Sequence, residues 1–211
     1  METINLKVVD IYHGDRVSSF QKAFDSGIRG VIHKATTGAT GKDKKYAARR
    51  PAALAAGLLW GAYHWGTNAD VTKQVKNFLK TAEPDDKTLV ALDFEDTPGN
   101  QMTLAQARQF LTLVAQELGR KPVLYSGHLI KEKLGNNADA FFGSHRLWLA
   151  QYDANPVVQK SWSSFWLWQY TDKTSGLTPN EVPGLPGNSD GDLDCNSYSG
   201  TVAQLKADWA S

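Results

Sequence analysis

Residues 89–96 read LVALDFED, an apolar run that leads directly into a cluster of carboxylates. A short apolar run of this kind is typical of a buried β-strand. Because alternate residues of a strand face the same side, Asp93 and Glu95 would project together, with Cα atoms about 6.5–7 Å apart. Phe94 and Asp96 would point away from them. Burial and mutual repulsion raise the pKa of at least one of two such acids, so this strand end is a candidate site.

Strand-like and helix-like segments alternate through the first 127 residues. Strands are predicted over 7–12, 30–36, 58–65, 88–95 and 121–127, and helices over 17–26, 45–56, 71–82 and 103–118. The helix that begins after Thr103 carries the capping-box pair Thr103 and Gln106. The strands are apolar on both faces, as expected of parallel strands covered by helices.

The pattern changes after residue 127. Further strands are predicted over 146–152, 165–170 and 192–198, with little helix between them, a long loop over 171–193 and a last helix over 201–209. We therefore predict an α/β fold, an irregular single-domain (β/α) TIM-like barrel with regular β/α units in the first half and mostly strands in the second. An open doubly wound sheet is the alternative. No break in composition divides the chain, so residues 1–211 are expected to form one domain.

Acids occur at the ends of three predicted strands. Asp10 follows the first strand, and Asp194 lies in the last. In a barrel the carboxyl ends of the strands open onto one mouth, so these acids would converge with Asp93 and Glu95. Any one of them alone is better explained as a helix cap or a partner of Lys34. The pair together with Asp10 favours a catalytic site, because one protonated acid beside ionised partners is what glycosidic bond cleavage requires.

Composition narrows the other classes of function. The formal net charge of +1 gives no support for nucleic acid or an anionic membrane as partner. The five histidines show no zinc-ligand spacing, and the single Cys195 is more typical of a small buried residue than of a nucleophile. Seven Trp and seven Tyr offer flat faces that suit sugar rings or a tight core. Among them, Tyr63 and Trp65 flank His64, and we expect all three to form a pocket wall.

Several motifs in order resemble the glycoside hydrolase family 25 lysozymes, the Chalaropsis-type muramidases also found among phage endolysins. VVDIYHGD is similar to the family's first strand with its active-site acid, here Asp10, and LVALDFE to its Asp-x-Glu hallmark. GVIHKATTG, WGAYHW, PVLYSG, LWLAQY and WLWQY resemble intervening strands, and DCNSYSG the closing motif, which selects Asp194 rather than Asp192. The resemblance covers nearly the whole chain.

The resemblance implies hydrolysis of the β-1,4 bond between N-acetylmuramic acid and N-acetylglucosamine in peptidoglycan. Glu95 would be the general acid, and Asp93 would orient the substrate's own acetamido group as it attacks the anomeric carbon. A nucleophile or base at Asp93 or Asp194 stays open, and Asp10 would tune the field. The implied sugar-binding residues are Tyr63, Tyr125, Trp148, Gln151, Tyr152 and Gln169. No metal or organic cofactor is implied, and a monomer is expected.

Two departures from the family pattern stand out. Thr37 occupies a position where many relatives carry Glu, so an accessory acid is missing, and Tyr12 replaces a small hydroxyl residue and would narrow one edge of the cleft. A rival reading is a catalytically silent glycan-binding protein on the same scaffold, and a third is an unrelated α/β hydrolase that uses Cys195.

Three routes to the cell wall are compatible with the sequence. The first residues show no signal peptide, and no apolar run is long enough to span a bilayer. Phage release, delivery as an effector and export of a processed form are therefore all compatible with action at the bacterial wall.

Overall fold

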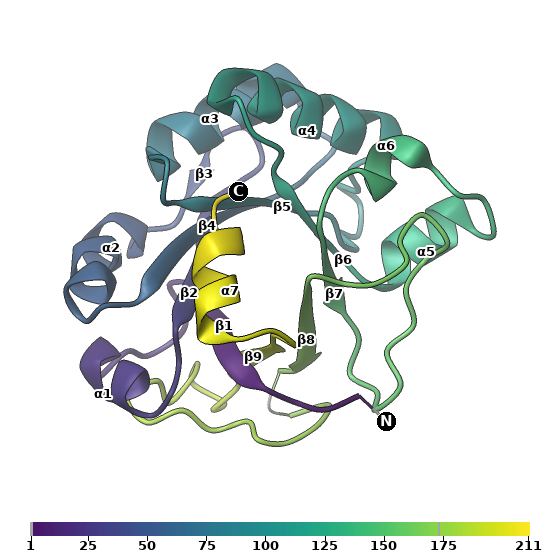
Figure 1. Cartoon of the computed structure of the whole chain (residues 1–211). Helices are drawn as coiled ribbons and strands as arrows, with labels where there is room; N and C mark the ends of the chain where they lie inside the picture. Colours follow the sequence, from purple (N-terminus) through teal and green to yellow (C-terminus); the bar gives the residue numbers. More distant parts are fainter. Residues whose placement is uncertain (1, 173) are drawn as a thin grey trace.

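A ring of eight parallel and antiparallel strands forms the centre of the molecule (Figure 1). The computed structural model describes residues 2–172 and 174–211. The ring contains β1 (Leu6–Ile11), β2 (Gly30–Thr37), β4 (Leu59–Trp65), β5 (Leu89–Asp93), β6 (Val123–Ser126), β7 (Leu147–Ala150), β8 (Leu167–Thr171) and β9 (Asp194–Ser197). The pairing of β1 with β2 closes it, and the two-residue strand β3 (Gly41–Lys42) attaches to the edge of β2.

The strands from β1 through β2, β4, β5, β6 and β7 to β8 pair in parallel. The last strand, β9, enters antiparallel between β8 and β1. The barrel prediction is confirmed, and the open doubly wound sheet is excluded because the ring is closed. The antiparallel entry of β9 was not predicted, since its short apolar pattern carries no sign of direction.

Helices surround the ring on its outer side (Figure 1). They are α1 (Phe20–Asp25), α2 (Tyr46–Ala55), α3 (Val71–Ala82), α4 (Leu104–Leu118), α5 (His128–Leu134) and α6 (Ala140–Gly143), whereas the last helix is α7 (Val202–Asp208). The capping box at Thr103 and Gln106 forms as predicted. The two short helices α5 and α6 were missed, because each is too short to show a clear helical period. Between β7 and β9 the structure describes no helix, in agreement with the irregular second half.

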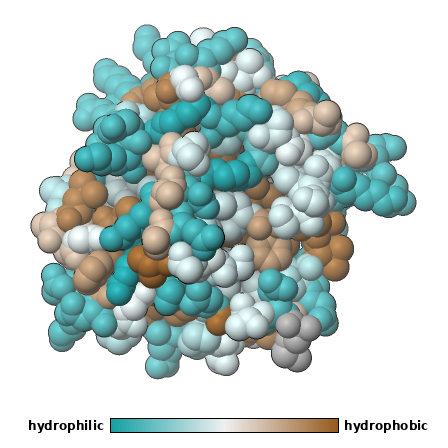
Figure 2. Space-filling model, in the orientation of Figure 1, coloured by the Kyte–Doolittle hydropathy of each residue, from teal (hydrophilic) through white to brown (hydrophobic). Residues whose placement is uncertain are grey.

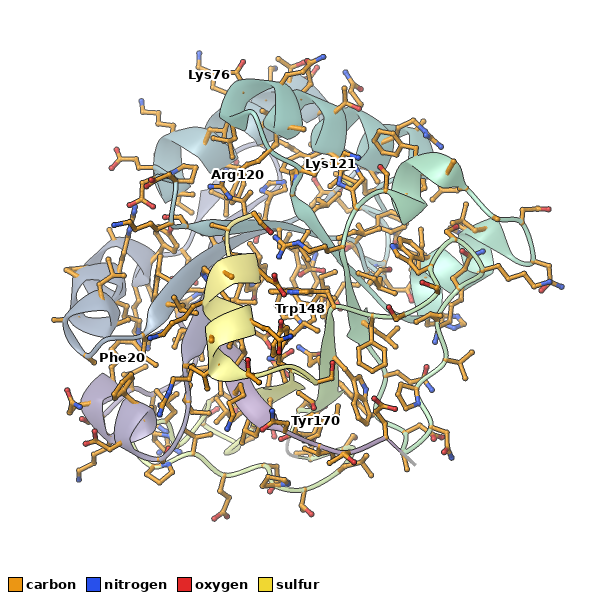
Figure 3. The ribbon with its side chains drawn as sticks, in the orientation of Figure 1. Phe20, Lys76, Arg120, Lys121, Trp148 and Tyr170 are labelled. Carbon is orange, nitrogen blue, oxygen red and sulfur yellow. The ribbon has the colours of Figure 1, made fainter. Side chains whose placement is uncertain are left out.

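Alternation along each strand divides the apolar residues into two cores. The outward residues, such as Val31, Leu92 and Leu124, pack beneath the surrounding helices. The inward residues fill the barrel and include Val8, Ile32, Leu89, Ala91, Val123, Trp148 and Leu167. Figure 3 places the labelled Trp148 near the centre of the ring and Lys76 on the outer surface. The interior is therefore packed, as in other barrels of this size.

The last helix, α7, lies across the centre of the ring (Figure 1) and closes one end of the barrel. Its neighbour Trp209 is 1% exposed and donates its indole N–H to the carbonyl of Trp60 at 2.8 Å. Both Trp60 and Gly30 lie at the amino ends of their strands, so α7 covers the end opposite the acids. Gly30 has to be glycine here, because a Cβ would lie 2.5 Å from the Trp209 ring.

The surface on this side is mixed. Figure 2 shows hydrophilic and hydrophobic residues interspersed over the face that carries α7. In the described part of the chain, no helix has the length and apolar character needed to cross a bilayer.

We predict that Trp209→Ala lowers the free energy of unfolding by about 3–5 kcal/mol, because it empties the closed end of the barrel and removes the bond to Trp60. Chemical denaturation measures this. Leu54→Ala, at a side chain that is 48% exposed, is the matched control and is expected to change stability by less than about 0.5 kcal/mol. Equal effects of the two substitutions would contradict the role of Trp209 in closing this end of the barrel.

Candidate active site

Two joined hollows occupy the end of the barrel opposite α7. The deeper one, here called the pit, has a volume of about 200 Å³ and is lined by Asp10, Tyr63, Trp65, Asp93, Glu95, Tyr125, Trp148, Tyr152, Gln169, Asp172 and Asp194. All four acids expected from the sequence therefore meet in one place, together with five of the six expected sugar-binding residues. The sixth, Gln151, lies in the second hollow, which shares Glu95, Tyr125 and Tyr152 with the pit.

The backbone around Asp93 and Glu95 is held by neighbouring strands. The strand β5 ends at Asp93, two residues earlier than predicted, so Glu95 lies on the following segment. Phe94 remains tied to β6, because its N–H donates to the carbonyl of Tyr125 at 2.9 Å and its own carbonyl accepts from Ser126 Oγ at 2.6 Å. These bonds keep the strand-like alternation as far as Glu95, which explains why both acids still line the pit.

Asp10 is the centre of a buried hydrogen-bond network. Its carboxylate accepts from Gln169 Nε2 at 3.0 and 3.1 Å and from Asn196 Nδ2 at 2.8 Å. Trp148 donates its indole N–H to Asn196 Oδ1 at 2.6 Å, and an indole can only donate, so the Asn196 amide must turn its NH₂ toward Asp10. Asp10 is thereby fixed as an acceptor.

Tyrosines complete the network from the other side of Gln169. Tyr125 and Tyr152 both donate their hydroxyls to Gln169 Oε1 at 2.8 Å. The register places Asp93 beside Tyr125 and Gln169 beside Asn196, so adjacent strands supply adjacent members. These polar side chains therefore form one connected layer at the open end of the barrel.

Asp194 reaches the pit by a different route from the other acids. It is the first residue of β9, and it pairs in register with Asp10. Because β9 is antiparallel, its beginning lies at the same end of the barrel as the carboxyl ends of its neighbours. Asp194 lies at the mouth of the barrel as expected. It does so because it begins an antiparallel strand, and not because it ends a parallel one, as the sequence analysis had assumed.

Burial and mutual repulsion control protonation in the pit. Burial, with the nearby charge of Asp10 as the second cause, raises the pKa of Glu95 to about 7. Burial also raises the pKa of Asp10 to about 7, against the hydrogen bonds from Asn196 and Gln169. The pKa values of Asp93 and Asp194 are raised as well, chiefly by burial and then by the charges of neighbouring acids. At neutral pH the cluster therefore retains protons that exposed carboxyls would lose.

Asp93 differs from the other acids in its partners. The side chain is buried, and its Oδ1 has no hydrogen-bond partner among the residues that the structure describes. An unpaired buried acceptor is costly, and a bound molecule with an N–H or O–H group would satisfy it.

The ammonium of Lys34 affects the pKa of two of the acids. The ammonium of Lys34 lies 4.7 Å from the ring centre of Trp65 and 5.0 Å from that of Tyr12, a cation–π arrangement on both sides. Its charge lowers the pKa of Asp93 and of Glu95, in opposition to burial. Tyr12, which was expected to narrow the cleft, is not among the described residues that line either hollow; its ring instead packs against Lys34.

The second hollow, here called the open compartment, has a volume of about 600 Å³. Asp96 lines it, which corrects the expectation that this acid points away from the cleft with Phe94. Strand alternation does not extend to Asp96, because the chain has left β5 and the residue is exposed at the rim.

The side chains of His64 and Cys195 both face outward, which contradicts the pocket wall expected at His64 and agrees with the expectation that Cys195 is a small buried residue. His64 alternates with Tyr63 and Trp65, and its ring stacks on Phe110 in the outer core at 4.7 Å instead of forming a pocket wall. Burial lowers its pKa to about 4. Cys195 likewise packs in the outer core, between two strand neighbours that face the other way, and it is not among the residues lining the pit. The Cys195 hydrolase is therefore not supported.

Some residues of the site were not singled out in the sequence. Asn196 stands inside the closing motif, in a segment predicted as a strand, and Asp172 follows β8, but neither was assigned a role in the site. Lys131 enters from α5, a helix that was not predicted. Across residues 2–172 and 174–211, no group of three or more His, Cys, Asp or Glu side chains is arranged to hold a metal ion.

Known proteins share the fold of this chain. A bacterial lysozyme from Streptomyces coelicolor has a TM-score of 0.84 at 24% identity, over 99% of each chain. A family 25 lysozyme from Aspergillus fumigatus has a TM-score of 0.78 at 26% identity, over 99% of this chain and 100% of that one. Lysozyme M1 from Streptomyces globisporus is 24% identical over 98% of this chain and 72% of its own length.

The family model for glycosyl hydrolases family 25 matches residues 9–177, which include Asp10, Asp93 and Glu95. This match, over most of the chain, agrees with the strand order and with the acids that meet at the open end of the barrel. The chain belongs to the glycosyl hydrolases of family 25.

Proposed function

We propose that this protein is a muramidase that hydrolyses the β-1,4 bond between N-acetylmuramic acid and N-acetylglucosamine in bacterial peptidoglycan. The observation that carries the proposal is the convergence of four carboxyls in a pit where Glu95 has a pKa of about 7. Lysozymes and a muramidase from Acremonium alcalophilum share this fold. Residues 1–211 would act as one catalytic domain.

Glu95 is the general acid in this proposal. Its proton passes to the glycosidic oxygen as the bond from that oxygen to the anomeric carbon breaks, so N-acetylglucosamine leaves as an alcohol. The acetamido oxygen of the muramic acid residue forms the new bond to the anomeric carbon. Water then attacks that carbon, gives its proton to the Glu95 carboxylate and restores the acetamido group.

Asp93 would bind the acetamido N–H during this attack. Its buried Oδ1 has no partner among the described residues, and an amide N–H is the donor that the substrate brings to that position. Accepting this hydrogen bond orients the acetamido group and stabilises the positive charge that develops on it. Asp194, beside Asp10 in the register, would instead contribute to the field around the sugar.

The aromatic residues and Gln169 would shape the sugar site. Trp65, Tyr63 and Tyr152 line the pit, where flat faces suit sugar rings. Trp148 is 1% exposed and donates to Asn196, so its larger contribution is to hold the polar layer. We propose further that the protein acts as a monomer at the wall after release or export, with no nucleic acid or membrane partner and no cofactor.

Digestion of purified peptidoglycan tests the function. The expected product carries N-acetylmuramic acid at the new reducing end, identified by mass spectrometry after borohydride reduction. N-acetylglucosamine at the reducing end would contradict the proposed bond. Binding without new reducing ends would instead favour the catalytically silent glycan-binding protein.

We predict that Glu95→Gln lowers kcat by about 10²–10⁴-fold, the usual contribution of a general acid. Release of reducing ends measures this, and circular dichroism checks the fold. Glu117→Gln, at an exposed position on α4, is the matched control and should retain full activity. Wild-type activity in Glu95→Gln would contradict the assignment of Glu95 as the general acid.

The pH profile tests the charges around Glu95. Because the general acid must be protonated and its pKa is about 7, kcat/KM should fall as pH rises through about 7. Lys34 lowers this pKa and Asp96 raises it. Lys34→Met should therefore move the falling limb to higher pH and Asp96→Asn to lower pH, as measured on soluble glycan fragments. A limb that stays fixed in both variants would assign it to another group.

A further inference from the structure

The open compartment adjoins the pit and is larger than it. It continues from the pit past Glu95, Tyr125 and Tyr152, and at about 600 Å³ it has three times the pit's volume of about 200 Å³. Its remaining wall comes from the β6–α5 junction, the end of β7 and the segment after Glu95: Asp96, Gly127, His128, Leu129, Lys131, Ala150 and Gln151.

Lys131 is fixed in this wall. The residue is half-buried, and its ammonium donates to Gln151 Oε1 at 2.6 Å. Burial lowers the pKa of this lysine, because partial removal from water makes the charged form less favourable. Gln151 is itself held, because Val157 donates its N–H to the same oxygen at 3.1 Å and the Gln151 amide donates to the Asn155 carbonyl at 3.2 Å. Lys131 is thus pre-positioned, unlike an ordinary surface lysine.

The charges of the compartment do not match a sugar. Lys131 offers an ammonium and Asp96 a carboxylate, whereas N-acetylglucosamine is neutral. The peptide that substitutes muramic acid through its 3-O-lactyl group carries carboxylates and, on its diamino acid, an amine. A compartment that presents groups of both signs complements such a peptide.

The position of the cleaved bond indicates where the stem peptide of the substrate would lie. The muramic acid residue supplies the anomeric carbon, so it occupies the pit that holds the four acids. Its lactyl substituent must leave this narrow space, and the open compartment adjoins the pit directly. We propose that the open compartment binds the stem peptide of the muramic acid residue, with Lys131, positioned by Gln151, paired to a peptide carboxylate. This inference rests on the proposed muramidase function.

A substrate pair tests the proposal. One substrate is a soluble glycan fragment with intact stem peptides, and the other is the same fragment after an amidase has removed them. Lys131→Met should raise KM for the peptide-bearing fragment by about tenfold, the effect of losing one charge-assisted hydrogen bond. On the peptide-free fragment its KM should stay within about twofold of wild type.

Lys133→Met is the matched control. It removes a lysine from the same helix, but one that pairs with Glu132 at 2.8 Å and does not line the compartment. Its kinetics should be those of the wild type on both substrates. Lys131→Arg keeps the charge and should recover most of the affinity for the peptide-bearing fragment. If Lys131→Met does not fold, the KM difference between Lys131→Arg and Lys131→Gln on the two fragments gives the same comparison.

The other outcomes overturn the proposal. An equal rise in KM on both fragments would mean that the compartment holds the leaving sugar. Identical kinetics of Lys131→Met and Lys133→Met would show that Lys131 contacts no substrate. A wild-type enzyme that cleaves both fragments with the same KM would exclude a peptide site, whereas one that cleaves neither would refute the muramidase function itself.

Discussion

The indole N–H of Trp148 sets the direction of the hydrogen bonds at the open end of the barrel. Because an indole can only donate, Asn196 must present its oxygen to Trp148 and its NH₂ to Asp10. The Gln169 amide adopts the same sense, with two tyrosine hydroxyls on its oxygen and Asp10 on its nitrogen. Trp148, Asn196, Asp10, Gln169, Tyr125 and Tyr152 can be buried here because each of them has a hydrogen-bond partner, which is the condition under which such networks are tolerated.

Asp93 is an exception to this pattern of satisfied hydrogen bonds, and the exception is relevant to the chemistry of the site. The layer satisfies Asp10 with amide donors from two strands, but it leaves Asp93 Oδ1 without a partner among the described residues. Both acids are buried, so the difference lies in their partners and not in their depth. Asp10 is therefore committed to the protein, whereas Asp93 remains available to a ligand. This distinction supports the proposal that Asp93, and not Asp10, binds the acetamido group of the substrate.

Strand alternation accounts for most of what the sequence could predict. It placed Asp93 with Glu95 and, applied consistently, it would also have placed His64 in the outer core between the inward Tyr63 and Trp65. The flanking aromatic residues Tyr63 and Trp65 had wrongly suggested that His64 lines the pocket. The same rule failed at Asp96, because the exact end of a strand depends on hydrogen bonds to its neighbours, which a single sequence does not reveal.

Features that depend on contacts between distant parts of the chain could not be predicted from strand alternation. The direction of β9 depends on how the chain returns from the long loop after β8, and Asp194 owes its place to that direction. The contact between Lys131 and Gln151 joins residues twenty positions apart. Lys131 lies in a seven-residue helix with little periodic signal, and Gln151 follows the end of β7. Resemblance to a family could indicate Gln151 as a cleft residue, but not that its amide is used to hold a lysine.

The two ends of the barrel divide the demands of stability and chemistry. At the amino ends of the strands, Trp209 packs over Gly30 and bonds to Trp60, and this end is closed. At the carboxyl ends, carboxyls with raised pKa values are held near one another, which opposes folding as pH rises, because each would ionise at lower pH in the unfolded chain. The apolar closure at one end offsets the repulsion at the other. Because the interior between them is filled by Trp148 and its neighbours, the acids cannot relax inward, and they keep the spacing that the chemistry needs.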